Sequence, residues 1–301
     1  MERDSLIYKL RRKGQVLAGK ILPDEFLSKI YFKAVLGKKL NLKEPKTFNE
    51  KLQWCKLYYF PKNDLVVQGA DKYAVREYIK SKGYGDKLVP LIDVWDSANE
   101  INWEELPEKF VLKCNHGCAY NIVCSDKSSL DEKQTKKQLN AWLKEDFGNF
   151  NLELHYSRIK DKKITAEKHL GDCITDYKFF CFNGEPKCIY VSTDLVHDRQ
   201  AQIGFFYLNG EKMPLKRDDY TDIEKADFPP YFKDMLEAAK VLAKDFPFVR
   251  VDFFITEEDF YFAELTFTPG ACMMPFNPEK FDAEWGEMLD ISKEMELYGK
   301  N

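Results

Sequence analysis

Long apolar runs are missing from this sequence. Charged residues interrupt every apolar stretch well before the roughly 18 consecutive apolar positions that a membrane-spanning helix needs, so we expect no transmembrane segment. The segment MERDSLIYKLRRKGQ also lacks the uninterrupted apolar core followed by small residues that marks a cleaved secretory signal. We therefore expect a cytoplasmic protein.

The sequence also lacks the cysteine spacing of a zinc site. Eight cysteines occur, at positions 55, 114, 118, 124, 173, 181, 188 and 272, but no CxxC pair is found among them. Cys114, Cys118 and Cys124 are close together, yet their spacing matches no common zinc finger. A chain of 301 residues buries a core of its own and does not need disulfides, so we expect reduced thiols.

The composition suits a folded protein. Hydrophobic residues make up 44% and aromatic residues 15% of the chain, enough to offset the entropy cost of ordering the backbone. Charge is uneven, because residues 1–51 hold 13 Lys or Arg and 6 Asp or Glu, a net +7 that leaves −11 elsewhere. This basic segment either lies on an anionic membrane or glycan carrier, or forms a solvated helix packed on its own domain. No nucleic-acid partner is expected.

Helical patterns dominate the first part of the chain. Residues 5–60 have apolar positions at helical spacing, with a stop at Gly37. Thr47 and Glu50 have the spacing of a capping box, which predicts the start of an aromatic helix. Its rings either belong to the core or form a sugar-stacking platform, and we favour the core. Further helices are predicted over residues 69–82, 131–147 and 231–245.

Short apolar runs bounded by Gly, Asn and Asp follow from Phe110 onward, and they predict β-strands. The runs cover residues 110–114, 120–124, 164–170, 177–182, 186–192, 203–208, 248–255 and 260–267. Because helical stretches separate groups of strands, we predict an α+β fold of antiparallel sheets with helices on their outer faces.

The segment FVRVDFFITEEDFYFAELTFTPG predicts two strands joined by a polar turn. Side chains two positions apart share one face of a strand, so Arg250 lies with Asp252, and Glu264 lies with Thr266. Acids on such a face are costly to bury without compensation. Either Arg250 pairs with them, or they bind a hard cation through their oxygen atoms, and we favour the cation.

A second segment places Lys113 at the end of a predicted strand, directly before the loop HGCAYN. Lysine is a compact cation for phosphate oxygens, and a small-residue loop containing Gly117 lets backbone N–H groups approach them. The alternative is an ordinary hairpin turn with an exposed lysine. His116 in this loop either contacts phosphate or is a hydrogen-bonded core histidine.

A third segment, KKITAEKHLGDCITDYKFFCF, places Glu167 at the end of one strand and Asp176 and Lys178 on a shared face of the next. Carboxylates accept hydrogen bonds from ribose hydroxyls or the adenine amino group, and lysines bind phosphates. A nucleotide site and a salt-bridged surface strand both fit this pattern.

Taken in order, these pieces resemble the ATP-grasp superfamily, with a motif-by-motif likeness to D-alanine ligases from residue 71 to residue 270. The similar nucleotide-side motifs are a leading Asp-Lys pair, a strand lysine before a small-residue loop, a Glu-Lys-x-Leu hinge and a ribose-binding acid: Asp71-Lys72, Lys113, Glu167-Lys168-His169-Leu170 and Asp176. The similar metal-side motifs are an arginine, two acids and a Pro-Gly turn: Arg250, Asp252, Glu264 and Pro269-Gly270.

A closer resemblance is to the TupA-like ATP-grasp proteins of bacterial surface-polysaccharide clusters, and it covers most of the chain. The segments that carry it are PKTFNEKLQW, DKYAVREYI, FVLKCNHG, DYKFFCFNGEPK and RVDFF…ELTFTPG. Thr266 stands where D-alanine ligases have an asparagine metal ligand, although TupA-like proteins are similar to this sequence there. The loop after Lys113 reads Gly-Cys-Ala where a Gly-Ser-Gly type is more usual.

The resemblance implies an ATP-grasp fold in which two α+β lobes clasp ATP. A helical region over 1–60 is expected to precede an ATP-grasp region over 61–301, with the ATP lobe at about 106–190 and the metal and acceptor lobe at about 191–301. The implied ATP-binding residues are Lys72, Lys113, Gly117, Glu167, Lys168, His169, Leu170 and Asp176. The implied Mg²⁺ ligands are Asp252, Glu264 and Thr266, and the implied catalytic residues are Arg250, Lys178 and His116.

By resemblance, the activity is that of a carboxylate–amine ligase. ATP-grasp ligases move the γ-phosphoryl group of ATP to a carboxylate, and an amine then attacks the acyl phosphate. The implied partners are a uronic acid of a surface glycan and an amino acid or small amine, with the basic amino end contacting the inner membrane face or glycan-assembly enzymes. Two alternatives stay open: an ATP-dependent sugar or glycan kinase, and a non-catalytic nucleotide-binding partner of a glycosyltransferase.

Overall fold

The computed structural model describes residues 6–172, 174–193, 202–218 and 220–299 of the chain. Its first elements are the helices α1 (Leu6–Ile21), α2 (Asp24–Leu36) and α3 (Phe48–Tyr58), so the predicted helical start is confirmed. Gly37 ends α2 with φ 72°, a left-handed conformation that suits glycine. The capping box is present, because the Thr47 hydroxyl accepts from the Glu50 N–H and the Glu50 carboxylate accepts from the Thr47 N–H.

The single helix predicted over residues 69–82 is wrong. The chain forms α4 (Asp64–Ala70) and α5 (Val75–Ser81), with a break between them. At the break the Asp71 carboxylate accepts hydrogen bonds from the Tyr73 and Ala74 N–H groups at 2.8 and 3.0 Å. Such side-chain bonds compete with the helical backbone pattern, and here they turn the chain at Lys72.

The first sheet contains β1 (Leu91–Trp95), β2 (Phe110–Cys114), β3 (Asn121–Cys124) and β4 (Ile164–Lys168), in the order β1-β4-β2-β3. All its pairs are antiparallel. The helices α6 (Glu132–Lys144), α7 (Gly148–Asn151) and α8 (Leu154–Ser157) lie between β3 and β4 in the chain, so the helix predicted over 131–147 ends earlier than expected. The prediction omitted β1.

The second sheet contains β5 (Thr175–Phe182), β6 (Glu185–Thr193), β7 (Gln202–Tyr207), β8 (Thr221–Asp222), β9 (Phe248–Ile255) and β10 (Phe260–Thr266). Their order is β10-β9-β5-β6-β7-β8, and each pair is antiparallel except β7 with β8. The helices α9 (Phe232–Ala243), α10 (Lys280–Met288) and α11 (Ser292–Tyr298) follow later in the chain, α9 before β9 and the other two after β10. Residues 175–190, which the prediction placed in the ATP lobe, form strands of this second sheet.

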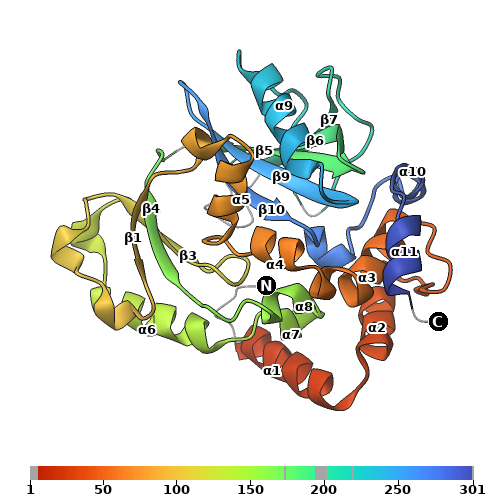
Figure 1. Cartoon of the computed structure of the whole chain (residues 1–301), viewed down its shortest axis with the longest axis horizontal. Coiled ribbons are helices and arrows are strands. Elements are labelled where there is room, and N and C mark those ends of the chain that lie inside the picture. Colours follow the sequence, from red (N-terminus) through yellow and green to blue (C-terminus); the bar gives the residue numbers. More distant parts are fainter. Residues whose placement is uncertain (1–5, 173, 194–201, 219, 300–301) are drawn as a thin grey trace.

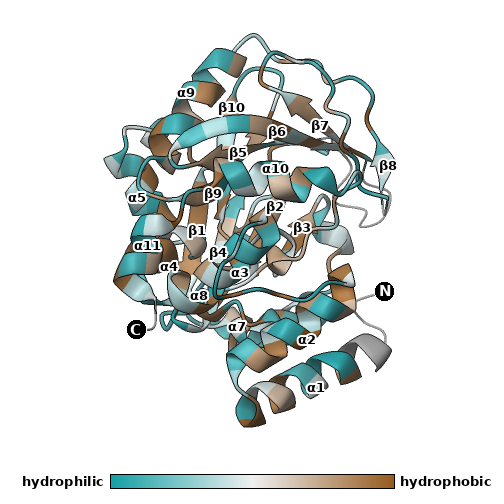
Figure 2. Ribbon diagram, turned by 90° about the vertical axis from the view of Figure 1, so that its right-hand side faces the viewer, coloured by the Kyte–Doolittle hydropathy of each residue, from teal (hydrophilic) through white to brown (hydrophobic). Residues whose placement is uncertain are grey.

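The two sheets lie beside each other, with α1 and α2 below them (Figure 1). The strands of both sheets are largely apolar, whereas the helices carry polar outer surfaces (Figure 2). None of the helices within the described ranges is both long and apolar enough to cross a membrane. The seven cysteines in those ranges are free thiols, as predicted, and Cys173 lies outside them.

Aromatic side chains join α3, α10 and the second sheet into one core. The Phe48 ring lies 5.0 Å from the Phe248 ring and 5.3 Å from Trp285, both in edge-to-face geometry. Trp285 also lies 4.8 Å from Phe180 of β5. Such pairs contribute about 0.5–1.5 kcal/mol each beyond their buried area, so this core fixes α3 against the sheet that carries the site.

Candidate active site

Three charged side chains lie in a row across the second sheet. Lys178 of β5 is paired with Asp252 of β9, and Asp252 is paired with Glu264 of β10. Side chains at paired positions share a face, with Cβ atoms about 4.5–5.5 Å apart. A bulge between Phe262 and Glu264 sets this register, since without it Ala263 would lie opposite Asp252. The Lys178 Nζ atom lies 3.1 Å from Asp252 Oδ2.

The Arg250 guanidinium joins both acids of this row. Its Nε and Nη2 atoms lie 2.7 and 2.6 Å from the two oxygens of Asp252. Nη2 also lies 3.4 Å from Glu264 Oε1 and 3.0 Å from Thr266 Oγ1, and the Thr266 hydroxyl donates to Glu264 at 2.8 Å. Arg250 and Asp252 therefore share a face, as predicted, and so do Glu264 and Thr266. Arg250 therefore pairs with both acids, which was the less favoured of the two alternatives offered by the sequence.

Lys72 and Asp176 extend the row at its two ends. Lys72 Nζ lies 3.3 Å from Glu264 Oε2, and Lys178 Nζ lies 3.3 Å from Asp176 Oδ2. We name the six groups the charged cluster: Lys72, Asp176, Lys178, Arg250, Asp252 and Glu264. It contains three cations and three carboxylates, so its formal charge is zero. Mutual pairing offsets the cost of burying charges that would be very unfavourable alone.

Burial and pairing act against each other within the charged cluster. Burial disfavours the ionised form of Glu264, but the nearby cations, Lys72 first, outweigh it and lower the pKa of Glu264 to about 2. Burial also disfavours charged Lys178, yet its carboxylate neighbours, Asp176 first, raise its pKa. For Asp176 burial dominates and raises the pKa, and its Oδ1 atom is buried without a hydrogen-bond partner. A buried acceptor without a donor costs about 1–3 kcal/mol, so Asp176 favours a ligand that brings a hydroxyl.

The donor atoms of Asp252, Glu264 and Thr266 fit a magnesium ion that is shared with a phosphate. Magnesium in nucleotide sites is held by one or two carboxylates together with phosphate oxygens and water. Asp252 and Glu264 supply two carboxylates at paired positions. Among the residues that the structure describes, no group of three or more His, Cys, Asp or Glu side chains is arranged to hold a metal ion.

A second ion pair lies in the first sheet and faces the charged cluster. Lys113 Nζ lies 2.5 Å from Glu167 Oε2 and 5.6 Å from the ring centre of Phe254 on β9. Phe254 is two positions from Asp252, so the two side chains share a face of the second sheet. The Lys113–Glu167 pair and the charged cluster thus lie on facing surfaces, where the two sheets meet.

The sequence of this chain matches one known protein family. The family described as TupA-like ATP-grasp matches residues 50–290, which is most of the chain. The chain belongs to the TupA-like ATP-grasp family. Its α+β fold is therefore the expected ATP-grasp fold, and the resemblance drawn from the sequence motifs is confirmed.

Solved structures that are similar to this ATP-grasp protein include several ligases. D-alanine–D-alanine ligase from Bacillus anthracis is 20% identical with a TM-score of 0.47, over 76% of this chain and 67% of that one. N5-carboxyaminoimidazole synthetase from Staphylococcus aureus, complexed with ADP, is 14% identical with a TM-score of 0.41, over 76% and 52%. L-amino acid ligase from Bacillus licheniformis is 13% identical with a TM-score of 0.41, over 69% and 44%. This chain spans about half to two thirds of their lengths, and no curated protein matches it.

The predicted hinge of this ATP-grasp protein, residues 167–170, begins within β4 and continues beyond its end. Glu167 is buried in that strand, and the exposed Lys168 donates its backbone N–H to the Pro90 carbonyl at 2.9 Å. His169 Nδ1 accepts from the Gly171 N–H at 3.2 Å, and Leu170 is half-buried beyond the strand. Their role in adenine binding stays a prediction.

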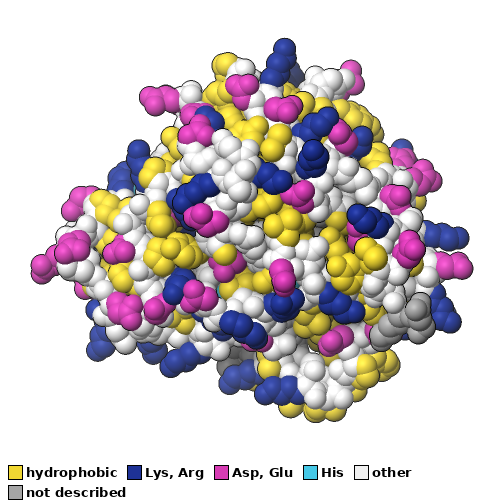
Figure 3. All heavy atoms as spheres, viewed as in Figure 1, with side chains coloured by type: hydrophobic (Ala, Val, Ile, Leu, Met, Phe, Trp, Pro, Cys, Tyr) yellow, Lys and Arg dark blue, Asp and Glu magenta, His cyan; other side chains and the backbone are white. Residues whose placement is uncertain are grey.

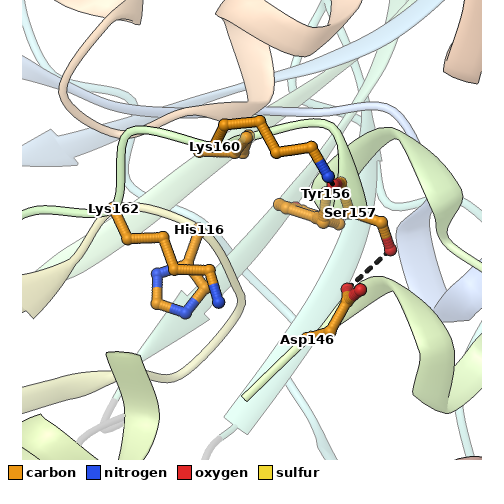
Figure 4. Close-up of a pocket in the computed structure, with 7 residues that line it drawn as sticks. His116, Asp146, Tyr156, Ser157, Lys160 and Lys162 are labelled. Atoms are coloured by element: carbon orange, nitrogen blue, oxygen red, sulfur yellow. Dashed lines mark hydrogen bonds between the residues drawn. The ribbon is translucent and has the colours of Figure 1, made fainter. Parts of the chain in front are cut away.

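The structure does not bring His116 into the charged cluster. His116 Nε2 lies 3.0 Å from the Trp142 carbonyl, and its ring lines a cavity of about 200 Å³ with Asp146, Ser157 and Lys162 among its neighbours (Figure 4). No charged-cluster residue lines that cavity. Burial lowers the pKa of His116 to about 4, so the ring is neutral near pH 7. Its placement is that of the hydrogen-bonded core histidine, the alternative left open by the sequence.

Gly117 meets aromatic side chains. A Cβ atom at this position would lie 2.8 Å from the Tyr120 ring and 2.9 Å from the Phe147 ring, closer than real contacts allow. The packing of the loop against these two rings is therefore sufficient to require glycine. A contact between the Gly117 backbone and phosphate stays a prediction.

Two residues that the sequence argument did not select hold this site together. Asn115 Nδ2 donates to both Asp71 oxygens at 2.9 Å, and its carbonyl accepts from the Lys72 N–H at 3.1 Å, which anchors Lys72 beside the loop after Lys113. Arg76 Nη1 lies 3.6 Å from Glu167 Oε1. Arg76 stands in DKYAVREYI, a segment that carried the resemblance, so a signal for it existed. Asn115 lies in FVLKCNHG, another segment that carried the resemblance, but nothing in the sequence indicated its contact with Asp71, 44 positions away.

Proposed function

We propose that this protein is an ATP- and Mg²⁺-dependent carboxylate–amine ligase. It forms an amide between a uronic acid of a bacterial surface polysaccharide, or of its precursor, and an amino acid or small amine. One observation supports the chemistry most: a charge-balanced cluster with two paired carboxylates faces a lysine on the opposite sheet, in a member of an ATP-grasp family. We place the reaction in the cytoplasm, where ATP is supplied.

Each group of residues has a role toward the nucleotide in this proposal. Lys72, Lys113 and Lys178 bind phosphate oxygens, and lysine suits them as a compact cation. The unpartnered Oδ1 of Asp176 accepts a hydrogen bond from a ribose hydroxyl. The backbone of residues 167–170 binds the adenine ring at the edge of the first sheet.

Asp252 and Glu264, together with Thr266, hold Mg²⁺ against the phosphates. The bound ion supplies positive charge that neutralises the phosphate oxygens during transfer. The paired positions of the two carboxylates and the position of the Thr266 hydroxyl, 2.8 Å from Glu264, support this assignment. Arg250 lies on the same face and is proposed as the donor to the acceptor carboxylate.

The reaction proceeds in two steps. First, an oxygen of the acceptor carboxylate forms a bond to the γ-phosphorus of ATP, and the bond from that phosphorus to the bridging oxygen breaks, which releases ADP. Second, the amine nitrogen attacks the carbonyl carbon of the acyl phosphate, inorganic phosphate leaves, and one nitrogen proton passes to water. Arg250 stabilises the oxygen charge, and one preorganised donor of this kind contributes roughly 3 kcal/mol. No covalent enzyme intermediate is needed.

Product analysis tests this proposal. The protein is incubated with ATP, MgCl₂, glucuronic or galacturonic acid derivatives and a panel of amines, and the masses of the products are measured. ADP, inorganic phosphate and an amide are expected. A stable phosphate ester would instead identify a glycan kinase. ATP binding without turnover under any acceptor would identify a non-catalytic partner of a glycosyltransferase, and either result would overturn the ligase.

A further inference from the structure

A large groove lies between α1 and the first sheet, outside the charged cluster. Its volume is about 1560 Å³, and its walls are α1, the loop and first residues of β3 over 118–122, α6, and residues 145–151. Pockets for single small molecules usually measure about 300–1000 Å³. The size of the groove suits an extended ligand of several linked units.

The side chains of this groove are unusually rich in amides and cations. The amides are Gln15, Asn121, Gln134, Gln138, Asn149 and Asn151. The cations are Arg11, Arg12, Lys13, Lys20 and Lys144, against three acids, Asp131, Glu145 and Asp146. An amide both donates and accepts hydrogen bonds, which matches the hydroxyl groups of sugars, and arginine and lysine bind carboxylates. Lys and Arg side chains gather at the lower left of the molecule, over the positions that α6 and the beginning of α1 have in the ribbon view (Figure 3).

Contacts in the middle of α1 hold this helix in place over the groove. Arg12 Nη1 lies 3.5 Å from Glu145 Oε2, and its guanidinium carbon lies 3.5 Å from the centre of the Phe150 ring. Gln15 Nε2 donates to Asn151 Oδ1 at 3.2 Å. Arg11, Lys13 and Lys20 are exposed, so they are free of such packing.

The loop after Lys113 connects the wall of the groove to the charged cluster. Cys118 lines the groove, and burial raises its pKa to about 11, with Lys72 and Glu264 close enough to act on it in opposite directions. The Lys72 N–H donates to the Asn115 carbonyl at 3.1 Å, which places the start of the same loop beside Lys72. The loop that lines this end of the groove therefore also contacts the backbone of Lys72, a member of the charged cluster.

We propose that this groove binds an oligosaccharide that carries carboxylates, as the acceptor chain of the ligase. The role of the oligosaccharide as the acceptor rests on the proposed function, whereas its binding in the groove does not depend on turnover. The amides bind the sugar hydroxyls, the exposed cations of α1 bind carboxylates along the oligosaccharide, and the terminal carboxylate lies toward the loop that contacts Lys72. The basic amino-terminal segment of the protein is thus part of the substrate site.

The test is direct binding of a hexamer of α-1,4-linked galacturonic acid to the full chain, measured by isothermal titration calorimetry at low salt. The corresponding glucose hexamer is the neutral comparison. The variant R11A/K13A/K20A removes three exposed cations of the groove. The variant K29A/K33A/K39A is its matched control, because it removes three exposed lysines that do not line the groove and changes the net charge equally.

The wild type is expected to bind the acidic hexamer at least tenfold more tightly than the neutral one, and R11A/K13A/K20A is expected to lose at least tenfold in affinity. The control is expected to stay within twofold of the wild type. ATP must raise the melting temperature of all three proteins equally, which shows that the fold and the nucleotide site are unchanged.

Several outcomes would contradict the binding of an acidic oligosaccharide in the groove. They are no binding of the acidic hexamer by the wild type, equal losses in both variants, or equal affinity for the neutral hexamer. Binding to phosphatidylglycerol vesicles that is lost only in R11A/K13A/K20A, without hexamer binding, would make this face a membrane surface instead. Hexamer binding in the groove without any ADP formation contradicts the ligase and leaves the groove intact. Ligation of monomeric galacturonate, with an unchanged KM for the hexamer in R11A/K13A/K20A, supports the ligase and contradicts oligosaccharide binding in the groove.

Discussion

Replacing Arg250 by methionine tests how the charged cluster is held together. The guanidinium makes two hydrogen bonds to Asp252 and one each to Glu264 and Thr266, and its side chain is only 14% exposed. Its removal changes a neutral cluster of three cations and three carboxylates into one with an excess negative charge. Breaking a buried ion pair by removing one partner costs about 3–5 kcal/mol.

We expect Arg250→Met to lie at the lower end of that range, about 3 kcal/mol, because Lys72 and Lys178 remain and methionine fills part of the volume. For a protein of this size, each kcal/mol shifts the melting temperature by about 2–4 °C, so a decrease of at least 6 °C is expected without Mg²⁺. Mg²⁺ with ATP is expected to recover part of this loss, since the ion neutralises the same acids. Arg250→Lys is the matched control, because it keeps the charge but not the planar fork.

Two assays on Arg250→Met separate structure from catalysis. Thermal unfolding with and without MgATP reports the structural part, and kcat under stabilising MgATP reports the catalytic part. Loss of one preorganised donor is expected to lower kcat by about 10²–10³. A variant that melts with the wild type would refute the account of the cluster. A variant that melts early but turns over at the wild-type rate would make Arg250 a structural counter-charge only.

Three further predictions concern the same site. Asp252→Asn and Glu264→Gln should keep the fold, by circular dichroism, but lose turnover, since each removes a charge from a Mg²⁺ ligand; activity at saturating Mg²⁺ in both would contradict the metal assignment. ATP should stabilise the protein by about 2.7 kcal/mol at a hundredfold excess over Kd, and equal protection by GTP in a melting assay would mean that residues 167–170 do not form the adenine site. Because the pKa of Glu264 is lowered from 4.5 to about 2 on folding, its stabilisation is complete above about pH 4.5 and is lost as the pH falls toward 2. Urea unfolding across that range should show a steeper loss for the wild type than for Glu264→Gln.

Local patterns predicted the features whose partners are close in sequence. The capping box of Thr47 and Glu50 needs only three positions, and it is present. The shared face of Arg250 and Asp252 follows from the two-residue period of a strand, and their hydrogen bonds confirm it. The family was predicted for a related reason, because the order of such short motifs survives where overall identity is low.

Features that depend on distant partners were not predicted. The row through Asp252 requires β5, β9 and β10 to pair in one register, and the bulge before Glu264 that sets it has no glycine or proline to mark it. The helix break at Asp71 was missed because Asn115, 44 positions away, fixes the Asp71 carboxylate. Strand β1 was missed since its burial does not alternate along the strand. In each case tertiary contacts, which the sequence does not display, determine the local structure.

Transfer of oxygen from the acceptor carboxylate to phosphate tests the central claim most directly. The protein is supplied with ATP, Mg²⁺, an amine and a uronic acid whose carboxylate is labelled with ¹⁸O, and the inorganic phosphate and the sugar product are analysed by mass spectrometry. An acyl phosphate intermediate predicts one ¹⁸O atom in the phosphate for every amide formed, because the carboxylate oxygen that attacks the γ-phosphorus leaves with it. Unlabelled phosphate alongside an amide, or a phosphate that stays bound to the sugar, would contradict the account.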